Sequence, residues 1–137
     1  MAKRYATEAR NDLGGTGTSR IVNGMELAVS SPLADHPALD ATNPEQLLAL
    51  AWATCLNATA QVIVGGASRT RVRVTAELHD LLPEVGYVFE VDAYLSVEGV
   101  EMTETARVLE AAHARCPVSK LLGSAPTVRI HAEPYAR

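Results

Sequence analysis

Two cysteines are the residues of this 137-residue chain best suited to chemistry. Cys116 precedes Pro117, and a proline that fits the first helical position predicts that Cys116 caps a short helix. Free backbone N–H groups and the helix dipole at such a position favour a thiolate, and Arg115 and Lys120 add positive charge. The local sequence therefore predicts a reactive thiol at Cys116.

The other cysteine, Cys55, lies in the middle of a long apolar segment. By its surroundings alone, a cysteine there is most simply a small buried hydrophobic side chain. No spacing rule requires that Cys55 and Cys116 meet. Because the N-terminal residues lack the apolar segment of an export signal, we expect a reducing cytoplasm. In that compartment a cysteine pair is more often reactive or simply buried than a structural disulfide.

The four histidines are scattered at positions 36, 79, 113 and 131. His113 and Cys116 are spaced for one helical turn, so they could share a metal ion or act as a catalytic pair. The sequence offers no second Cys/His pair, and Pro117 breaks the helix between them and any further ligand. We therefore expect no metal site and no bound cofactor.

Composition narrows the classes of function. The chain is 47% hydrophobic and 20% charged with a net charge of −4, which is typical of a soluble globular protein, and its length suits one domain over residues 1–137. The absence of a basic block and the scarcity of aromatic residues argue against nucleic acid and anionic membranes as partners.

The apolar stretch from Leu47 to Val64 could span a bilayer by length. Asn57 and Gln61 within it favour a buried helix and no membrane.

The N-terminal half predicts a small hairpin followed by a long helix. Residues 2–10 could form a strand, residues 11–18 a glycine-containing loop, and the Asn23-Gly24 pair a hairpin turn. Residues 30–42 are expected to connect the hairpin to a helix that ends near Val64. Asn43 can cap this helix, and Gln46 can complete a capping box.

The C-terminal half predicts two strands, two helices and a last strand. Residues 70–80 and 87–97 alternate between apolar and polar side chains, as half-buried strands do. Thr103 is expected to cap a helix that ends near Arg115, and residues 117–122 form a short third helix before a strand over 128–132. This order is an α+β fold, for which we expect antiparallel sheets. No glycine-rich nucleotide-binding motif is present.

Two motifs in these elements resemble those of a known family. The first is the run from Thr42 to Leu47, which reads Thr-Asn-Pro-Glu-Gln-Leu, with Cys55 ten residues after Glu45. The second is the Cys-Pro-Val-Ser sequence that begins at Cys116. Together with the element order, they resemble the OsmC/Ohr family of osmotically inducible and organic hydroperoxide resistance proteins. The Cys-Pro-Val-Ser wording is closer to the OsmC branch, whereas the N-terminal hairpin and the Asn-Pro-Glu-Gln run are closer to the Ohr branch.

The resemblance implies a cytoplasmic thiol peroxidase that acts on organic hydroperoxides in the oxidative stress response. It assigns Cys55 as the peroxidatic nucleophile and Cys116 as the resolving cysteine of a redox-active intramolecular disulfide. An external dithiol, of the lipoyl type in the Ohr branch, would reduce that disulfide. The implied fold is an intertwined homodimer with antiparallel sheets wrapped around two central helices.

The family also implies an arginine that is held by the glutamate of the first motif and assists the reactive thiolate. Glu45 matches that glutamate, but Thr16 stands where the arginine is expected. Arg20 aligns with a second arginine of the family loop, and Arg10 is the other candidate. On a simpler interpretation, Arg20 is only an exposed strand residue and Glu45 only a carboxylate favoured by the helix dipole.

Without a guanidinium beside it, Cys55 in an apolar helix would have a raised pKa and react slowly. The departure at Thr16 therefore leaves two alternatives to the peroxidase open. One is a redox sensor with the same fold, and the other is a dimer that binds an apolar ligand between its helices.

Overall fold

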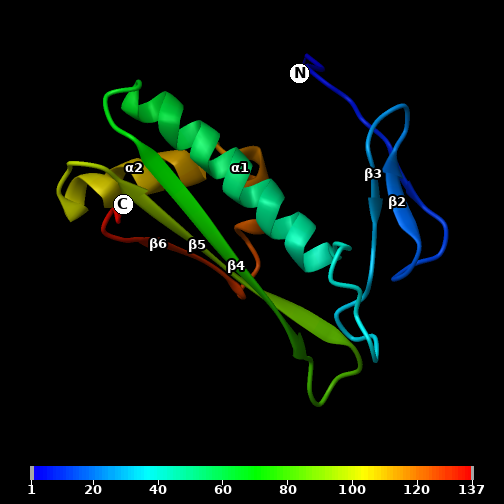
Figure 1. The fold of residues 1–137 in the computed structure, drawn as a ribbon. Coiled ribbons are helices and arrows are strands. Elements are labelled where there is room, and N and C mark those ends of the chain that lie inside the picture. Colours follow the sequence, from blue (N-terminus) through cyan, green and yellow to red (C-terminus); the bar gives the residue numbers. More distant parts are fainter. Residues whose placement is uncertain (1, 137) are drawn as a thin grey trace. The chain divides into compact units, whose positions relative to one another are not determined.

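The computed structural model describes residues 2–136, and their contacts group the chain into two compact units, residues 1–46 and 47–137 (Figure 1). The single domain expected over residues 1–137 stays a prediction.

The first unit contains a small antiparallel sheet. Its strands are β1 (Ala9–Asn11), β2 (Thr18–Ile21) and β3 (Glu26–Ala28), in the order β1-β2-β3. The predicted hairpin turn is confirmed: Asn23 adopts a left-handed φ of 60° between β2 and β3, a conformation that asparagine tolerates well. The strand expected over residues 2–10 is shorter: β1 begins only at Ala9, opposite Ile21, and one further hydrogen bond joins the Val22 N–H to the Glu8 carbonyl at 2.9 Å.

Helix α1 (Pro44–Val64) begins and ends near the predicted residues. Asn43 Oδ1 accepts the backbone N–H of Gln46 at 2.8 Å, which confirms the cap. The capping box is not completed, because Gln46 Oε1 instead accepts a hydrogen bond from the Thr42 hydroxyl at 3.0 Å. Gly65 ends the helix with a φ of 64°.

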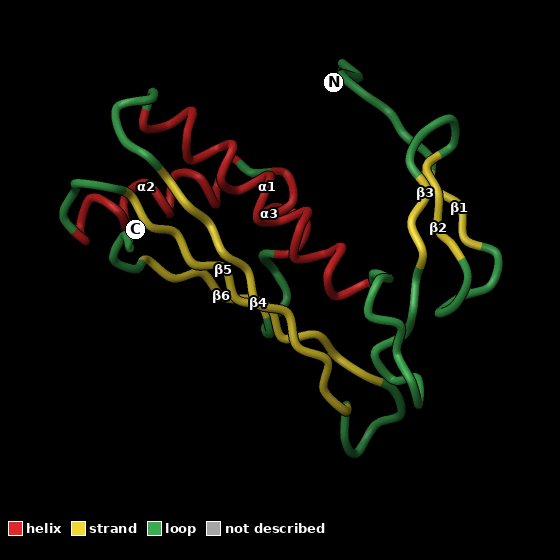
Figure 2. The backbone as a smooth tube through the Cα atoms, viewed as in Figure 1, coloured by secondary structure: helices red, strands yellow, loops and turns green. Residues whose placement is uncertain are grey.

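A second three-stranded sheet forms in the other unit (Figure 2). Strands β4 (Thr70–Asp80) and β5 (Tyr87–Val97) pair antiparallel, as predicted, and β6 (Val128–Ala132) pairs with β5 in parallel. The expectation of purely antiparallel sheets is therefore wrong. The chain between β5 and β6 holds two helices, and such a crossover returns the chain parallel to its starting strand.

Those two helices are α2 (Met102–Arg115) and α3 (Pro117–Leu122). Both end as the sequence predicts, but the cap of α2 is Glu101 rather than Thr103. The Glu101 side chain makes no capping hydrogen bond, and its backbone carbonyl accepts the N–H of Thr105 at 3.0 Å. The helix therefore begins two residues earlier than a side-chain cap at Thr103 predicts.

The core lies between one face of the second sheet and its helices. Trp52, Leu56 and Ala60 recur every four residues along α1 and are fully buried. They belong to one hydrophobic cluster. Its other buried residues are Val91, Ala93, Leu95, Val97, Val108, Leu109, Ala112 and Cys116. This core places the middle of α1 against the junction of α2 and α3, where the second cysteine lies.

Candidate functional site

The two cysteines meet inside the second unit. Cys55 lies midway along α1 and Cys116 lies between α2 and α3, and their Sγ atoms are 3.2 Å apart. Both thiols are free. The separation is about 1 Å longer than a disulfide bond of ~2.05 Å, so a small movement would join the two sulfurs. Chain folding thus brings together two residues that no sequence spacing rule pairs.

Cys116 serves as a cap for two helices at once. Its backbone N–H bonds to the carbonyl of Ala112 at 2.8 Å and ends α2. Its side chain is the N-cap of α3, where Sγ accepts the backbone N–H of Ser119 at 3.4 Å, and Pro117 occupies the start of that helix. The predicted position of Cys116 at a helix N-terminus is therefore confirmed.

The two thiols have pKa values displaced in opposite directions. Burial raises the pKa of Cys55, the backbone N–H of Val118 opposes this, and the Cys116 thiol reinforces it. Burial also acts to raise the pKa of Cys116, but hydrogen bonds with the Ser119 N–H and with Cys55 outweigh it and lower that pKa. When the thiol pair of the isolated chain loses one proton, Cys116 is therefore the favoured thiolate and Cys55 keeps its proton. Cys55 needs a nearby cation to become the thiolate.

The solvent exposure of the two cysteines favours Cys55 as the attacking thiol, whereas their pKa values favour Cys116. Cys116 is fully buried, whereas Cys55 is partly exposed. A molecule arriving from solvent meets the Cys55 sulfur first. The geometry is thus suited to attack by Cys55 on an incoming substrate, followed by attack of the buried Cys116 on Cys55.

A buried hydrogen bond links the helices that carry the cysteines. The indole Nε1–H of Trp52 donates to the Ser119 hydroxyl at 2.8 Å. Ser119 is the serine of the Cys-Pro-Val-Ser motif and Trp52 is the single tryptophan of the chain, but the sequence assigned neither of them a role. Their positions give the available signal: each lies three residues from a cysteine.

Glu45 lies in the first turn of α1, as the sequence predicts. Its Oε2 is buried and has no hydrogen-bond partner among residues 2–136. The arginine that the family resemblance implies is therefore not bound to it in the isolated chain. A buried carboxylate oxygen without a donor is costly, so this group is set to receive a cation.

Both candidate arginines belong to the first sheet. Arg10 on β1 pairs across the strands with Arg20 on β2, so the two side chains share one face. Arg10 is bound to Glu8 at 2.6 Å. Arg20 is partly buried, and its side chain makes no hydrogen bond or ion pair within the described residues. Thr16 lies exposed in the loop between β1 and β2.

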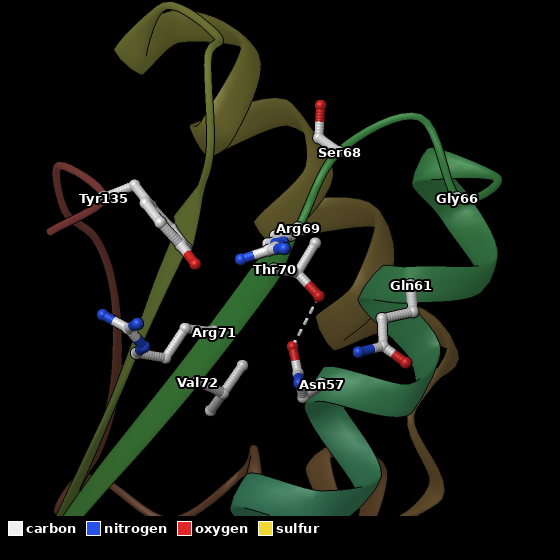
Figure 3. A pocket seen from close by; sticks show the side chains of 9 residues that line it. All are labelled: Asn57, Gln61, Gly66, Ser68, Arg69, Thr70, Arg71, Val72 and Tyr135. Atoms are coloured by element: carbon white, nitrogen blue, oxygen red, sulfur yellow. Dashed lines mark hydrogen bonds between the residues drawn. The ribbon is translucent and has the colours of Figure 1, made fainter. Parts of the chain in front are cut away.

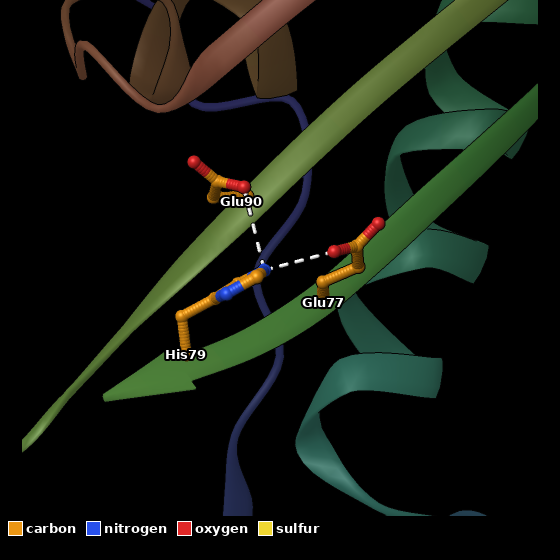
Figure 4. A group of neighbouring side chains, drawn as sticks. All are labelled: Glu77, His79 and Glu90. Carbon is orange, nitrogen blue, oxygen red and sulfur yellow. Dashed lines mark hydrogen bonds and ion pairs between the residues drawn. The ribbon is translucent and has the colours of Figure 1, made fainter. Parts of the chain in front are cut away.

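The histidines do not form a site with Cys116. His113 lies in the last turn of α2, and its buried Nδ1 has no partner among the described residues. The described side chains that could together hold a metal ion are elsewhere, on the outer face of the second sheet (Figure 4). There His79 Nε2 lies 2.8 Å from the Glu77 carboxylate and 3.3 Å from the Glu90 carboxylate.

A cavity of about 490 Å³ lies where α1 ends and β4 begins (Figure 3). Asn57 and Gln61 of α1 face Arg69 and Arg71 across it, and the Thr70 hydroxyl bonds to Asn57 at 2.7 Å. Neither cysteine lines the cavity, so it is separate from the thiol pair.

Comparisons with known proteins agree with this architecture. The family described as OsmC-like protein matches residues 36–131. A Mycoplasma pneumoniae protein named organic hydroperoxide resistance protein-like is 32% identical over 127 residues, covering 89% of each chain. The organic hydroperoxide resistance protein OhrA of Bacillus subtilis is 38% identical over 84 residues, covering 58% of this chain and 59% of the relative.

Solved structures show the same fold. A Lactobacillus casei protein described as a redox protein has a TM-score of 0.87 and 34% identity, covering 99% of this chain and 95% of that one. An Elizabethkingia anophelis organic hydroperoxide resistance protein has a TM-score of 0.85 at 24% identity, covering 98% and 100%. With the family matched over most of its length and its two cysteines in contact, the chain belongs to the OsmC-like, or OsmC/Ohr, family.

Proposed function

We propose that this protein is a cytoplasmic, cysteine-based peroxidase that reduces organic hydroperoxides. The observation that carries the proposal is the 3.2 Å contact between an accessible thiol, Cys55, and a buried thiol, Cys116. Two adjacent thiols can supply the two electrons that reduction of a peroxide consumes, because they are oxidised together to one disulfide. The names of the relatives support peroxide resistance as the setting.

In the first step, the Cys55 thiolate attacks the terminal peroxide oxygen, forming an S–O bond and breaking the O–O bond. The alkoxide takes a proton and leaves as an alcohol, and Cys55 becomes a sulfenic acid. In the second step, the Cys116 thiolate attacks Cys55 Sγ, which forms the disulfide and releases hydroxide as water. The reaction as written needs no metal and no bound cofactor.

An external dithiol completes the cycle. Its thiolate attacks the Cys55–Cys116 disulfide through a mixed disulfide, and its second thiol then releases both cysteines in the reduced form. The reductant is itself oxidised to a cyclic disulfide, the chemistry of a lipoyl group on a protein. This assignment rests on the family resemblance.

The surroundings of Cys55 support an organic substrate. Leu48, Val118 and Cys55 pack against the hydrophobic core that contains Cys116, and α1 presents further apolar side chains to solvent. An apolar wall contributes binding energy to an alkyl or aryl group and none to hydrogen peroxide. Arg20 or Arg10 would supply the cation that Cys55 needs, and the Glu45 carboxylate would hold that arginine in place.

A stoichiometric oxidation tests the proposal. Reduced protein mixed with one equivalent of cumene hydroperoxide should lose both free thiols, whereas hydrogen peroxide should react about ten- to hundredfold more slowly. Stopped-flow kinetics with thiol counting before and after measures both quantities. Retention of both thiols would instead favour the apolar-ligand-binding dimer, and slow loss without preference for the organic peroxide would favour the redox sensor.

We also propose that the protein is a homodimer joined along α1. Leu50 and Val62 on this helix are 62% and 67% exposed, although the helix is strongly apolar. They belong to an outer stripe opposite the buried face, whose exposed members are Leu47, Leu50, Ala51, Thr54, Ala58 and Val62. Small residues between larger ones let two helices approach closely.

A bilayer is the other environment that α1 fits. Among the described residues, it is the helix long and apolar enough to span a membrane, with 17% of its most apolar window buried. A second copy of the chain would cover the outer stripe without a bilayer. Asn57 and Gln61 are tolerated in so apolar a helix because both line the cavity between α1 and β4, where Asn57 accepts a hydrogen bond from the Thr70 hydroxyl at 2.7 Å.

Leu50→Glu is expected to weaken the dimer about 100-fold or more, because a charge would be buried twice at a symmetric interface. Analytical ultracentrifugation over a concentration series measures the dissociation constant. Leu121→Glu is the control, since Leu121 is 80% exposed on α3 and should leave the dimer intact. A wild-type protein that stays monomeric, or that sediments only with lipid vesicles, would contradict the proposal.

A further inference from the structure

A buried side-chain hydrogen bond between Trp52 and Ser119 joins the two segments that carry the thiols. Trp52 and Ser119 are 0% and 1% exposed, and the indole N–H donates to the serine hydroxyl at 2.8 Å. Trp52 lies three residues before Cys55 on α1, and Ser119 lies three residues after Cys116 on α3. The bond therefore fixes α1 to α3 within one helical turn of each sulfur.

Ser119 continues the connection to the Cys116 sulfur. Its backbone N–H donates to Sγ at 3.4 Å, and its hydroxyl also helps to lower the pKa of Cys116. An indole offers one donor and no acceptor, so it occupies a lone pair of the hydroxyl oxygen and leaves the hydroxyl proton for another acceptor. Ser119 thus accepts a hydrogen bond from Trp52 through its hydroxyl and donates one to the resolving thiol through its backbone N–H.

We propose that Trp52 and Ser119 are positioning residues that hold Cys116 in line for attack on Cys55. The peroxide chemistry in this inference rests on the proposed function. The positions of the two sulfurs are independent of it. The affected step is formation of the S–S bond by Cys116 thiolate, with loss of hydroxide from the Cys55 sulfenic acid. The preceding attack of Cys55 on peroxide needs neither residue.

A general loss of stability would act differently from a loss of positioning. A destabilised protein unfolds at lower temperature, but its folded fraction forms the disulfide at the normal rate. A protein without the Trp52–Ser119 bond keeps its sulfenic acid longer, and a second peroxide molecule can then oxidise it to sulfinic acid. Sensitivity to over-oxidation therefore separates the two roles.

Ser119→Ala and Trp52→Phe each remove the hydrogen bond. Each variant should form sulfenic acid at the wild-type rate but form the disulfide about three- to tenfold more slowly, the factor expected for one net hydrogen bond. Rapid quench with mass spectrometry follows sulfenic, disulfide and sulfinic forms separately. The double variant should resemble the single variants, because both remove the same bond.

Two comparisons make the result specific. Ser119→Thr keeps a hydroxyl and should restore much of the disulfide rate that Ser119→Ala loses. Val108→Ala removes volume from a buried site on α2 and should lower stability without changing the disulfide rate. The pH midpoint of disulfide formation should also rise in Ser119→Ala, because the Cys116 thiolate loses a donor. Trp52→Phe carries the test if Ser119→Ala does not fold.

A measurement without peroxide separates this inference from the proposed function. Equilibration with mixtures of reduced and oxidised dithiothreitol gives the equilibrium constant for the Cys55–Cys116 disulfide. This constant should fall about three- to tenfold in Ser119→Ala and Trp52→Phe. If it falls while the wild type consumes no hydroperoxide, the positioning role stands and the peroxidase proposal fails. Unchanged disulfide equilibrium and rate in both variants would overturn the inference.

Discussion

Cys55→Ser is expected to lower the rate of cumene hydroperoxide consumption at least about 1000-fold. A serine hydroxyl is not ionised at neutral pH and cannot be oxidised to a sulfenic acid, so the first step is lost. The measurement is the initial rate of hydroperoxide loss with excess dithiothreitol as reductant. Circular dichroism establishes that the variant is folded, which the small change of sulfur to oxygen should permit.

Cys116→Ser is the matched variant, because it removes the second thiol and leaves the first. It should still react once with the hydroperoxide, and the sulfenic acid on Cys55 should be captured by dimedone. The pKa directions of the isolated chain favour the thiolate on Cys116, so the reverse assignment is testable. If dimedone labels Cys55→Ser at Cys116 and leaves Cys116→Ser unlabelled, the roles of the two cysteines are exchanged.

The second large effect is expected from the arginines. Arg10 and Arg20 are cross-strand neighbours, so each could replace the other, and only the double variant Arg10→Met/Arg20→Met should remove the cation. Burial raises the pKa of Cys55 in the isolated chain, so its thiol is mainly neutral at pH 7. Loss of the cation should therefore slow oxidation about 100-fold at that pH, because the thiolate is the reacting form.

The rate of Cys55 oxidation in the arginine double variant should depend on pH in a definite direction. Raising the pKa of a thiol favours its neutral form, so below that pKa the thiolate fraction increases about tenfold per pH unit. The double variant should accelerate about tenfold per unit from pH 7 to pH 9, whereas the wild type should change little over this range. Stopped-flow oxidation at a series of pH values measures both profiles.

Controls for the arginine prediction come from the same chain. Arg107→Met removes an arginine that pairs with Glu104 on the exposed face of α2, and it should leave the rate unchanged. Glu45→Gln should give an intermediate loss, because the arginine would remain but lose its carboxylate. A wild-type pH profile in Arg10→Met/Arg20→Met would show that neither arginine serves Cys55.

Much of the local structure follows from short-range rules that the residues obey individually. Asn43 and Gly65 bound α1 because a side-chain oxygen and a left-handed φ satisfy the ends of a helix. The alternation over residues 70–80 and 87–97 predicts both strands, because one face of a sheet must be buried. The rule for α2 failed at Thr103, since water or backbone can satisfy helix N–H groups without a side-chain cap.

The sequence by itself therefore determined the element order, the cap at Cys116, and, through the two motifs, membership in the family. The tertiary structure alone decided that Trp52 bonds to Ser119 and that β6 runs parallel to β5. It also places the sulfurs of Cys55 and Cys116, whose pairing the family resemblance implied, 3.2 Å apart. Each of these depends on residues far apart in the chain. Their juxtaposition is set by how α1, α2 and α3 pack on the sheet, a property that local periodicity and spacing do not contain.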